Sequence, residues 1–373
     1  MIEIVKVNNK KDMKKFVRFP TELYKDNPYY VPPIEIDELN LANPKKNASF
    51  EDCDAEYFLA KKDGKVVGRI AGLICHAFNK KNKTKYARFS RFDTINDPEV
   101  AKALLETAEN WARGKGMEYI HGPLGFDDLE REGLMTKGFD VMGTFQGSYN
   151  APYYQKLVED NGYVPDCKWV EWRIPVPKEE NERASRVANM VEKRYGFHEK
   201  QFKNKKEIIE KYGKEFFKLL DECYENIYGT IPFTDKLIEQ TIGLFNIVLD
   251  PDYISLIFNK KDELIGFGLG YPSLAKAMNK SKGRYLPFGW IRLLHAIKHP
   301  KVVELGLIAV KPEYQKQGVT AVIINKMHKR MRENGIIYAD TGLQLETNIP
   351  AIASLDMFER ELIRKKTCYI KKL

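Results

Sequence analysis

The stretch that decides the fold is Val302-Val-Glu-Leu-Gly-Leu-Ile-Ala-Val-Lys-Pro-Glu-Tyr-Gln-Lys-Gln-Gly-Val-Thr-Ala321. Its first nine residues, Val302 to Val310, read as a buried strand, and Lys311 to Tyr314 form a proline-bearing turn. An amphipathic helix is expected from Ala321 to Glu333. A strand that enters a helix through a glycine-bearing loop leaves backbone N–H groups unpaired, and the helix dipole adds partial positive charge there. The loop is therefore prepared for a phosphate or pyrophosphate.

This stretch resembles the coenzyme A loop of the GNAT superfamily of acyl-CoA-dependent N-acyltransferases. The family's pattern is Arg/Gln-x-x-Gly-x-Gly/Ala after a strand and x-Pro-x-Tyr/Phe. Gln315, Gly318, Pro312 and Tyr314 fit it, and Thr320 departs from it mildly. The resemblance implies that acyl-CoA, most simply acetyl-CoA, lies against Ile308, Ala309, Val310, Gln315, Lys316, Gln317, Gly318, Val319, Thr320, Ala321 and Asn348.

The chain also repeats itself. The hairpin expected over Tyr57–Gly72 is answered by one over Tyr253–Gly268, and Gly68 and Gly266 stand early in the two second strands. We therefore expect an α/β protein of two tandem GNAT-like domains, each a mixed, mostly antiparallel twisted sheet with helices on both faces. The predicted boundary follows paired prolines and divides the chain into domains 1–176 and 177–373.

The two halves have different motifs. In the first half no glycine follows the strand Ala87–Ile95, so Asp97 or Asn96 is expected to cap an ordinary helix, with Pro98 in its first turn, rather than to form a CoA loop. That half has an Asn and a Tyr like the family's later motif, at Asn150 and Tyr154. In the second half the Asn is Asn348, but the position of the family's usual catalytic Tyr falls at Leu355.

Acyl transfer to an amine needs a base, because most amines are protonated at neutral pH. Glu304, near the start of the CoA strand, is the first candidate, and Glu346 is the second, beside Asn348. Asp127 and Asp128 belong to a glycine-rich acidic stretch that either receives a cationic substrate, together with Asn150 and Tyr154, or is a long ordered loop. The candidate catalytic residues are thus Glu304, Glu346 and Asn348.

Composition argues against nucleic-acid-binding, metal-binding and membrane-spanning proteins. The chain has 373 residues and a net charge of +9, but its lysines are dispersed, so a nucleic-acid partner is not expected. Its 5 cysteines form no CxxC pair, and no metal site is expected. No apolar run is long enough to span a membrane and no signal-peptide core precedes the first strand, so we expect a cytoplasmic location.

Three functions stay open. The first is an N-acyltransferase, which would use either acetyl-CoA with a small amine or a long-chain acyl-CoA with a lipid amine. The second is a non-catalytic CoA-binding or regulatory protein, favoured by Leu355. The third is a nucleic-acid-binding protein, which a steep salt dependence of binding would reveal. The stretch Lys282–Pro300 is aromatic and basic, and is either an acyl-chain cover, a peripheral membrane contact or an extra helix on the core. The sequence does not indicate the acceptor amine or the oligomeric state.

Overall fold

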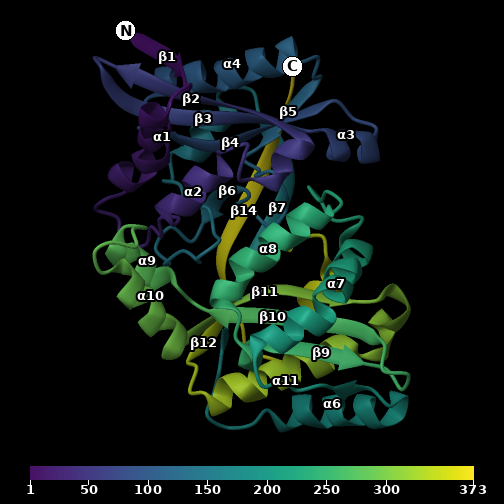
Figure 1. Ribbon diagram of the computed structural model, residues 1–373. Helices are drawn as coiled ribbons and strands as arrows, with labels where there is room; N and C mark the ends of the chain where they lie inside the picture. The colour runs from purple at the N-terminus through teal and green to yellow at the C-terminus, as the bar shows by residue number, and fades with distance from the viewer.

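The computed structural model describes residues 1–373, and one continuous sheet runs through the whole molecule (Figure 1). We call residues 1–176 the N-half and residues 177–373 the C-half. The N-half supplies strands β1 (Ile2–Lys6), β2 (Cys53–Lys62), β3 (Lys65–Cys75), β4 (Tyr86–Thr94), β5 (Tyr119–Gly122), β6 (Leu134–Lys137) and β7 (Val164–Pro175). Its helices are α1 (Lys10–Leu23), α2 (Glu35–Leu41), α3 (His76–Asn82), α4 (Pro98–Gly114) and α5 (Tyr154–Glu159), with the 3-10 turn η1 (Ala48–Glu51).

The C-half repeats this order of elements. Its strands are β8 (His198–Glu199), β9 (Ile254–Phe258), β10 (Leu264–Pro272), β11 (Val302–Val310), β12 (Tyr338–Thr341), β13 (Gln344–Leu345) and β14 (Glu361–Lys372). Its helices are α6 (Glu182–Tyr195), α7 (Lys205–Tyr224), α8 (Asp235–Val248), α9 (Ala275–Ser281), α10 (Gly289–Lys298), α11 (Val319–Glu333) and α12 (Ile349–Ala353), with the 3-10 turns η2 (Pro251–Tyr253) and η3 (Pro312–Gln317).

The strand order is β1-β2-β3-β4-β5-β14-β7-β12-β11-β10-β9-β8. Only β4–β5 and β11–β12 pair in parallel, and every other pair is antiparallel, so the predicted α/β class with a mixed, mostly antiparallel sheet is confirmed. The last strand, β14, lies between β5 and β7 of the N-half, and β7 in turn pairs with β12 of the C-half. Figure 1 shows β14 and β7 running together from one half to the other. Each half is thus completed by a strand of the other, and the division at residue 176 stays a prediction.

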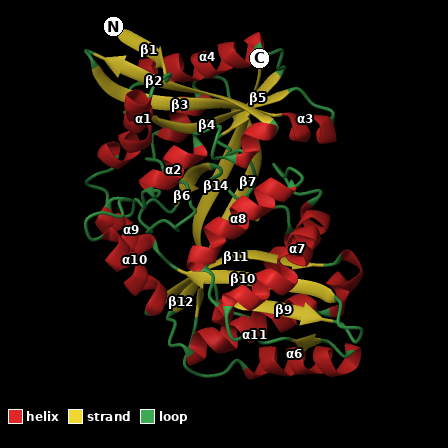
Figure 2. Ribbon diagram, in the orientation of Figure 1, coloured by secondary structure: helices red, strands yellow, loops and turns green.

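Helices cover both faces of the sheet in each half (Figure 2). In the N-half, α4 and α5 bury one face and α1 packs on the other. In the C-half, α6 and α11 cover one face, and α7 and α8 cover the other. Apolar side chains on each face of the strands pack against these helices, because successive side chains of a strand point to opposite faces of the sheet.

Equivalent glycines support the predicted repeat. Gly68 lies opposite Thr94, and Gly266 lies opposite Val310, so each glycine faces the end of the strand that leads to the next helix. A Cβ at Gly68 would come within 2.6 Å of Leu104 on α4, and one at Gly266 within 3.0 Å of Val319 on α11. The helix packs so closely on the strand in both halves that no side chain fits there.

Candidate functional site

The sequence prediction of a strand, turn and helix around the candidate phosphate loop is confirmed. β11 spans the predicted Val302–Val310, η3 contains the proline, and α11 begins at Val319, two residues earlier than expected. The Gln315 side chain donates a hydrogen bond to the Val310 carbonyl at 3.3 Å. The N–H of Gly318 has no acceptor in the chain, and Lys316 forms no ion pair. The helix start therefore offers unpaired donors and free positive charge to an anion.

Gly318 is required for the backbone itself as well as for ligand access. Its φ is +80°, in the left-handed region, and a Cβ there would lie 2.9 Å from Val191 on α6. A larger residue would therefore strain the turn and push α6 away from α11. Substitution of this glycine would disturb the packing as well as the loop.

Beyond the loop, β11 and β12 separate into a wedge. Their parallel pairing ends at Leu305 and Thr341, while β11 continues to Val310. On its other side β11 has a bulge at Gly306, because Leu269 pairs with Leu307 and Gly270 with Leu305. The bulge turns the end of β11 away from β12. The wedge leaves one edge of β11 without a partner strand.

Side chains of α7 occupy that edge. The Tyr224 hydroxyl donates to the Ile308 carbonyl at 3.2 Å, and the Cys223 thiol donates to the Val310 carbonyl at 3.2 Å. Sequence reasoning did not single out Tyr224. The signal available was its place at the end of the long amphipathic α7, in a half whose usual catalytic Tyr is replaced by Leu355. Leu355 is buried with Phe358 and offers no hydroxyl.

Glu304 lies two residues before the bulge and is 3% exposed. Its two carboxylate oxygens accept hydrogen bonds from the Ser273 hydroxyl at 2.6 Å and from the Phe145 N–H at 2.8 Å. Burial raises its pKa to about 7, and the Asp340 carboxylate adds to the rise. A carboxyl group with that pKa is half ionised at neutral pH, as a general base requires.

Glu346 and Asn348 lie in a different environment. Glu346 follows β13 and forms an exposed ion pair with Lys365 at 2.8 Å, and this hydrogen bond lowers its pKa. The Asn348 side chain caps α12 by accepting from the Ala351 N–H at 3.3 Å. No hydrogen bond links either residue to Glu304. Of the two glutamates, Glu304 has the protonation behaviour expected of a base at neutral pH.

The acidic stretch of the N-half lies next to the wedge. Asp127 and Asp128 have pKa values raised to about 6, mainly by burial. Burial also raises the pKa of the Tyr224 phenol, and the nearby Asp128 carboxylate adds to the rise. Glu132, also buried, has a pKa well above its usual value, again mainly through burial. One oxygen of Asp128 and one of Glu132 have no hydrogen-bond donor. These free acceptors and mutually repelling carboxyls suit a cationic group.

Asn150 and Tyr154 lie within the N-half, and their side chains form hydrogen bonds with backbone groups of that half. Asn150 accepts from the Met135 N–H at 2.6 Å and donates to the Met135 carbonyl at 3.1 Å. The buried Tyr154 hydroxyl bonds both the N–H and the carbonyl of Thr94, at 2.7 and 3.0 Å. The polar groups of these two side chains are therefore engaged away from the wedge.

The first half starts its helix as expected. Asp97 caps α4 by accepting from the N–H groups of Glu99 and Val100, at 3.0 and 3.4 Å, and Pro98 is the first residue of the helix. The cap carboxylate occupies the N–H groups that an anion would need. The N-half thus has an ordinary helix start where the C-half has the candidate phosphate loop.

One cluster contains three groups that metals bind, with ligand atoms of His121, Asp166 and Cys368 within 4.8 Å of one another. The Tyr228 hydroxyl lies among them, 2.8 Å from the His121 Nδ1 and 3.3 Å from the Cys368 sulfur, and it donates to Asp166. This hydroxyl already supplies a hydrogen-bond partner to each group. We read the cluster as a hydrogen-bond network between the halves.

Comparisons with known proteins agree with this geometry. Residues 213–357, which include the loop, the wedge and Glu304, match the model of the Acetyltransferase (GNAT) family. A tandem GNAT protein from the clavulanic acid biosynthesis pathway has the same fold, with a TM-score of 0.60 over 100% of this chain and 98% of that one, at 10% identity. The chain is thus similar to the GNAT family by sequence over residues 213–357, and to a tandem GNAT protein by fold over its whole length. The predicted resemblance and the tandem fold are both confirmed.

Two relatives resemble this chain along most of its length. Protein YghO of Escherichia coli (strain K12) is 26% identical over 375 residues, covering 98% of this chain and 94% of that protein. The bacterial ceramide synthase of Caulobacter vibrioides (strain NA1000 / CB15N) is 24% identical over 327 residues, covering 84% and 82%. None of the helices of the present chain has the length and apolarity needed to cross a bilayer.

Proposed function

We propose that this chain transfers an acyl group from an acyl-CoA to the nitrogen of an amine, in the wedge between β11 and β12. One observation carries the proposal. The C-half brings together a helix start with unpaired N–H groups, a strand edge without a partner strand and, two residues before the bulge, a buried carboxyl group with a pKa of about 7. The first two fit the two ends of a CoA molecule, and the third fits the deprotonation of an amine.

In this proposal the pyrophosphate binds the loop from Gln315 to Ala321. The pantetheine arm lies along Ile308, Ala309 and Val310, whose free edge supplies backbone groups. To admit the arm, the hydroxyl of Tyr224 and the thiol of Cys223 must exchange their contacts with the β11 carbonyls. No metal takes part.

Glu304 acts as the base in the proposed reaction. Its carboxylate accepts the proton that the ammonium must lose before the nitrogen can attack the thioester carbonyl. The C–N bond then forms and the C–S bond breaks. The nitrogen releases its second proton to give the amide, and the thiolate gains a proton. We propose that Tyr224, whose hydroxyl is 3.2 Å from the Ile308 carbonyl, supplies that proton in place of the tyrosine that Leu355 replaces.

The acidic side chains of the N-half would hold the amine. Asp128 and Glu132 each have a buried oxygen without a donor, and an ammonium group would supply both charge and hydrogen bonds. Asp127 would support Asp128. This assignment places the amine between the halves.

We further propose a long-chain acyl-CoA and a lipid amine as substrates. The support is the similarity to the Caulobacter relative, a bacterial ceramide synthase, since a ceramide is the N-acyl derivative of a long-chain amino alcohol. Acetyl-CoA with a small amine is the other donor and acceptor pair. A CoA-binding protein without activity is the remaining alternative, and Leu355 is the observation that favours it.

The test is release of free thiol from acyl-CoA by the purified full chain. Palmitoyl-CoA and acetyl-CoA are each combined with sphinganine and with spermidine, and product amides are identified by mass spectrometry. The proposal expects turnover with palmitoyl-CoA and sphinganine. Turnover only with acetyl-CoA and spermidine would contradict the lipid substrates and keep the transferase. Thermal stabilisation by acyl-CoA without thiol release in any combination would favour the CoA-binding protein.

A further inference from the structure

The segment between α9 and β11 exposes apolar side chains to an unusual extent. Of the fourteen large hydrophobic residues that are exposed in the chain, five lie within nine residues: Leu286 at 76%, Phe288 at 62%, Trp290 at 48%, Ile291 at 47% and Leu294 at 47%. We call these five residues the apolar ridge. Single exposed apolar residues are ordinary, but a contiguous group marks an interaction surface.

The ridge is the outward side of a helix that is anchored by its other side. Leu293 of α10 is buried at 7% exposure, and Ala296 and Ile297 pack on the same cluster of α8, α9 and the N-half. At 100° per residue, Trp290, Ile291 and Leu294 fall on one exposed arc of α10. The core therefore fixes α10 with this arc turned outward, so the exposure does not come from a loose segment.

The charged residues that flank the ridge in the sequence are all basic. From Lys276 to Lys301 the chain contains seven Lys and Arg residues and no Asp or Glu. Arg284, just before the ridge, also lines a cleft of about 740 Å³ with basic residues of α1. These α1 residues are Lys10, Lys11, Lys14, Lys15 and Arg18. We call them, with Arg284, the basic cleft.

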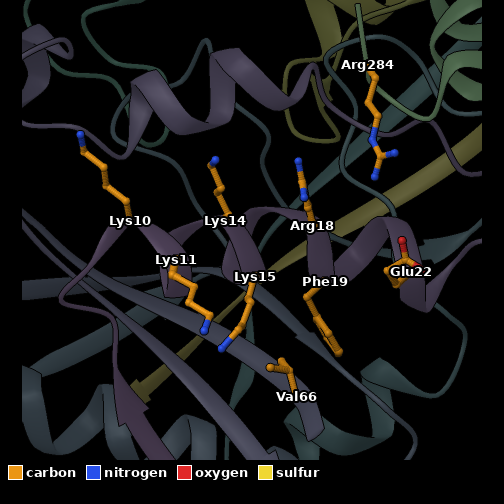
Figure 3. A pocket seen from close by; sticks show the side chains of 9 residues that line it. All are labelled: Lys10, Lys11, Lys14, Lys15, Arg18, Phe19, Glu22, Val66 and Arg284. Carbon is orange, nitrogen blue, oxygen red and sulfur yellow. The ribbon is translucent and has the colours of Figure 1, made fainter. Parts of the chain in front are cut away.

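The ridge and the basic cleft are held next to each other. Glu35 of α2 pairs with Arg18 at 2.6 Å and with Arg284 at 3.6 Å, so one carboxylate joins α1 to the segment that precedes the ridge. Figure 3 shows Arg284 reaching from its own segment toward the end of α1 that carries Arg18 and Glu22. In Figure 1, α1, α9 and α10 lie along the same side of the molecule. Lys10, Lys11 and Lys14 form no ion pair.

We propose that the apolar ridge and the basic cleft together dock this protein on a bilayer that contains anionic lipids. Phe, Trp and Leu side chains insert at the boundary between headgroups and acyl chains, and Lys and Arg beside them attract anionic headgroups. Nucleic acid would use the basic side chains but would leave the ridge exposed to water. A protein partner would have to match both a helix and a separate basic cleft, which a fluid lipid surface does without a fixed shape.

The energies suit reversible docking. Inserted apolar side chains and basic residues near an anionic surface both favour binding, and neither contribution is large enough to make binding irreversible. α10 leads directly into β11, so docking would bring the C-half to the membrane by the same element that precedes Glu304. The inference does not rest on the proposed reaction, because binding to vesicles is measured without any acyl-CoA.

The experiment is flotation of the full-length protein with vesicles in a density gradient. Vesicles of phosphatidylcholine alone are compared with vesicles that also contain phosphatidylglycerol. The ridge variant is Phe288→Ser with Trp290→Ser, and the cleft variant is Lys11→Glu with Lys14→Glu. The matched control is Met190→Ser with Lys193→Glu on α6, where Met190 is 61% exposed and Lys193 is also exposed. All these side chains are exposed or line an open cleft, and thermal unfolding verifies that each variant is folded.

Wild type and control are expected to float with the anionic vesicles. The ridge variant should bind at least about tenfold more weakly to either vesicle, because two inserted side chains are lost. The cleft variant should lose the preference for anionic vesicles. Wild type that does not float, or variants that float as well as the control, would overturn the proposal. Retention on heparin or DNA without flotation would also overturn it and would indicate a polyanion partner.

Discussion

The same strand end is treated in opposite ways in the two halves. At the end of β4, the Tyr154 hydroxyl bonds both the N–H and the carbonyl of Thr94, so the strand edge is closed by a side chain of the core. At the equivalent end of β11, the Val310 carbonyl receives only the Cys223 thiol and the Gln315 amide, both at the edge of the wedge. In the N-half a core side chain fixes the strand edge. In the C-half side chains of α7 and of the loop occupy it, and in the proposed function they give way to acyl-CoA.

The start of the same strand also differs, and here the halves support each other. Arg88 lies opposite Leu73 of β3, as Glu304 lies opposite Tyr271 of β10. Arg88 donates to the Gly229 carbonyl of the C-half at 2.8 Å, and Glu304 accepts from the Phe145 N–H of the N-half at 2.8 Å. Equivalent positions therefore hold the halves together with opposite charge. Only the glutamate can accept a proton from an amine.

The largest expected effect that tests this comparison comes from Glu304→Gln. Loss of the base should lower kcat by roughly 10²- to 10⁴-fold, while the affinity for acyl-CoA stays the same, because the loop is untouched. The wild-type rate should rise with pH through about 7, where Glu304 loses its proton, and level off above. Glu346→Gln is the control and should keep most of the activity. Equal losses in both variants would contradict the assignment of the base.

The next effect is on stability. The folded pKa of Glu304 is raised to about 7 from 4.5, so the folded protein binds this proton more tightly than the unfolded chain. Its contribution to the free energy of unfolding is then full below pH 4.5 and falls as the pH rises to about 7, by about 3 kcal/mol. Denaturant unfolding of wild type and Glu304→Gln across this range should show the difference shrinking in that direction. A difference that does not change with pH would mean an ordinary pKa.

A pair of tyrosine variants compares the strand ends directly. Tyr154→Phe leaves the buried Thr94 N–H without an acceptor and should lower the free energy of unfolding by about 1–3 kcal/mol, without changing acyl-CoA affinity. Tyr224→Phe at the other strand end should do the reverse and lower kcat with little loss of stability. Calorimetry and turnover on both proteins measure these effects. The same pattern in both variants would remove the contrast between the halves.

The smallest expected effect comes from Thr320→Asp. An acidic residue in the first turn of α11 stabilises the helix slightly but repels a pyrophosphate, so acyl-CoA should bind roughly tenfold more weakly with no loss of melting temperature. Isothermal titration measures both the affinity and the number of sites, which should be one per chain. Glu99→Gln in the first turn of α4 is the matched control, with no expected effect on binding. This change is sharper than a substitution at Gly318, which would meet Val191.

Much of the fold could be predicted from the sequence, because short-range patterns determine its strands, turns and helix starts. β11 was predicted to the residue, and the Asp97 cap with Pro98 and the paired hairpins also followed from local chemistry. The exchange of β7 and β14 was not predicted, because strand pairing between distant segments leaves no periodic signal in either strand. Tyr224 was missed for the same reason, since only tertiary packing brings the end of α7 to β11.

For the site residues too, the sequence predicts the position along the chain but not the contacts in the folded protein. Glu304 was chosen from its place in the strand, but its pKa depends on burial beneath the Phe145 segment of the other half. Asn150 and Tyr154 matched a motif by sequence, and the structure shows their polar atoms bonded to the N-half backbone. Motifs indicate where a side chain lies along the chain, whereas its partners come from contacts between the halves.

The exchange of β7 and β14 also bears on how the chain is made. β5 pairs with β4 as soon as both are made, but it can acquire its second neighbour only after β14 has been synthesised. Until then the N-half presents an open strand edge, which invites pairing with another chain. Translation must therefore reach β14 before the sheet of either half has all of its strands.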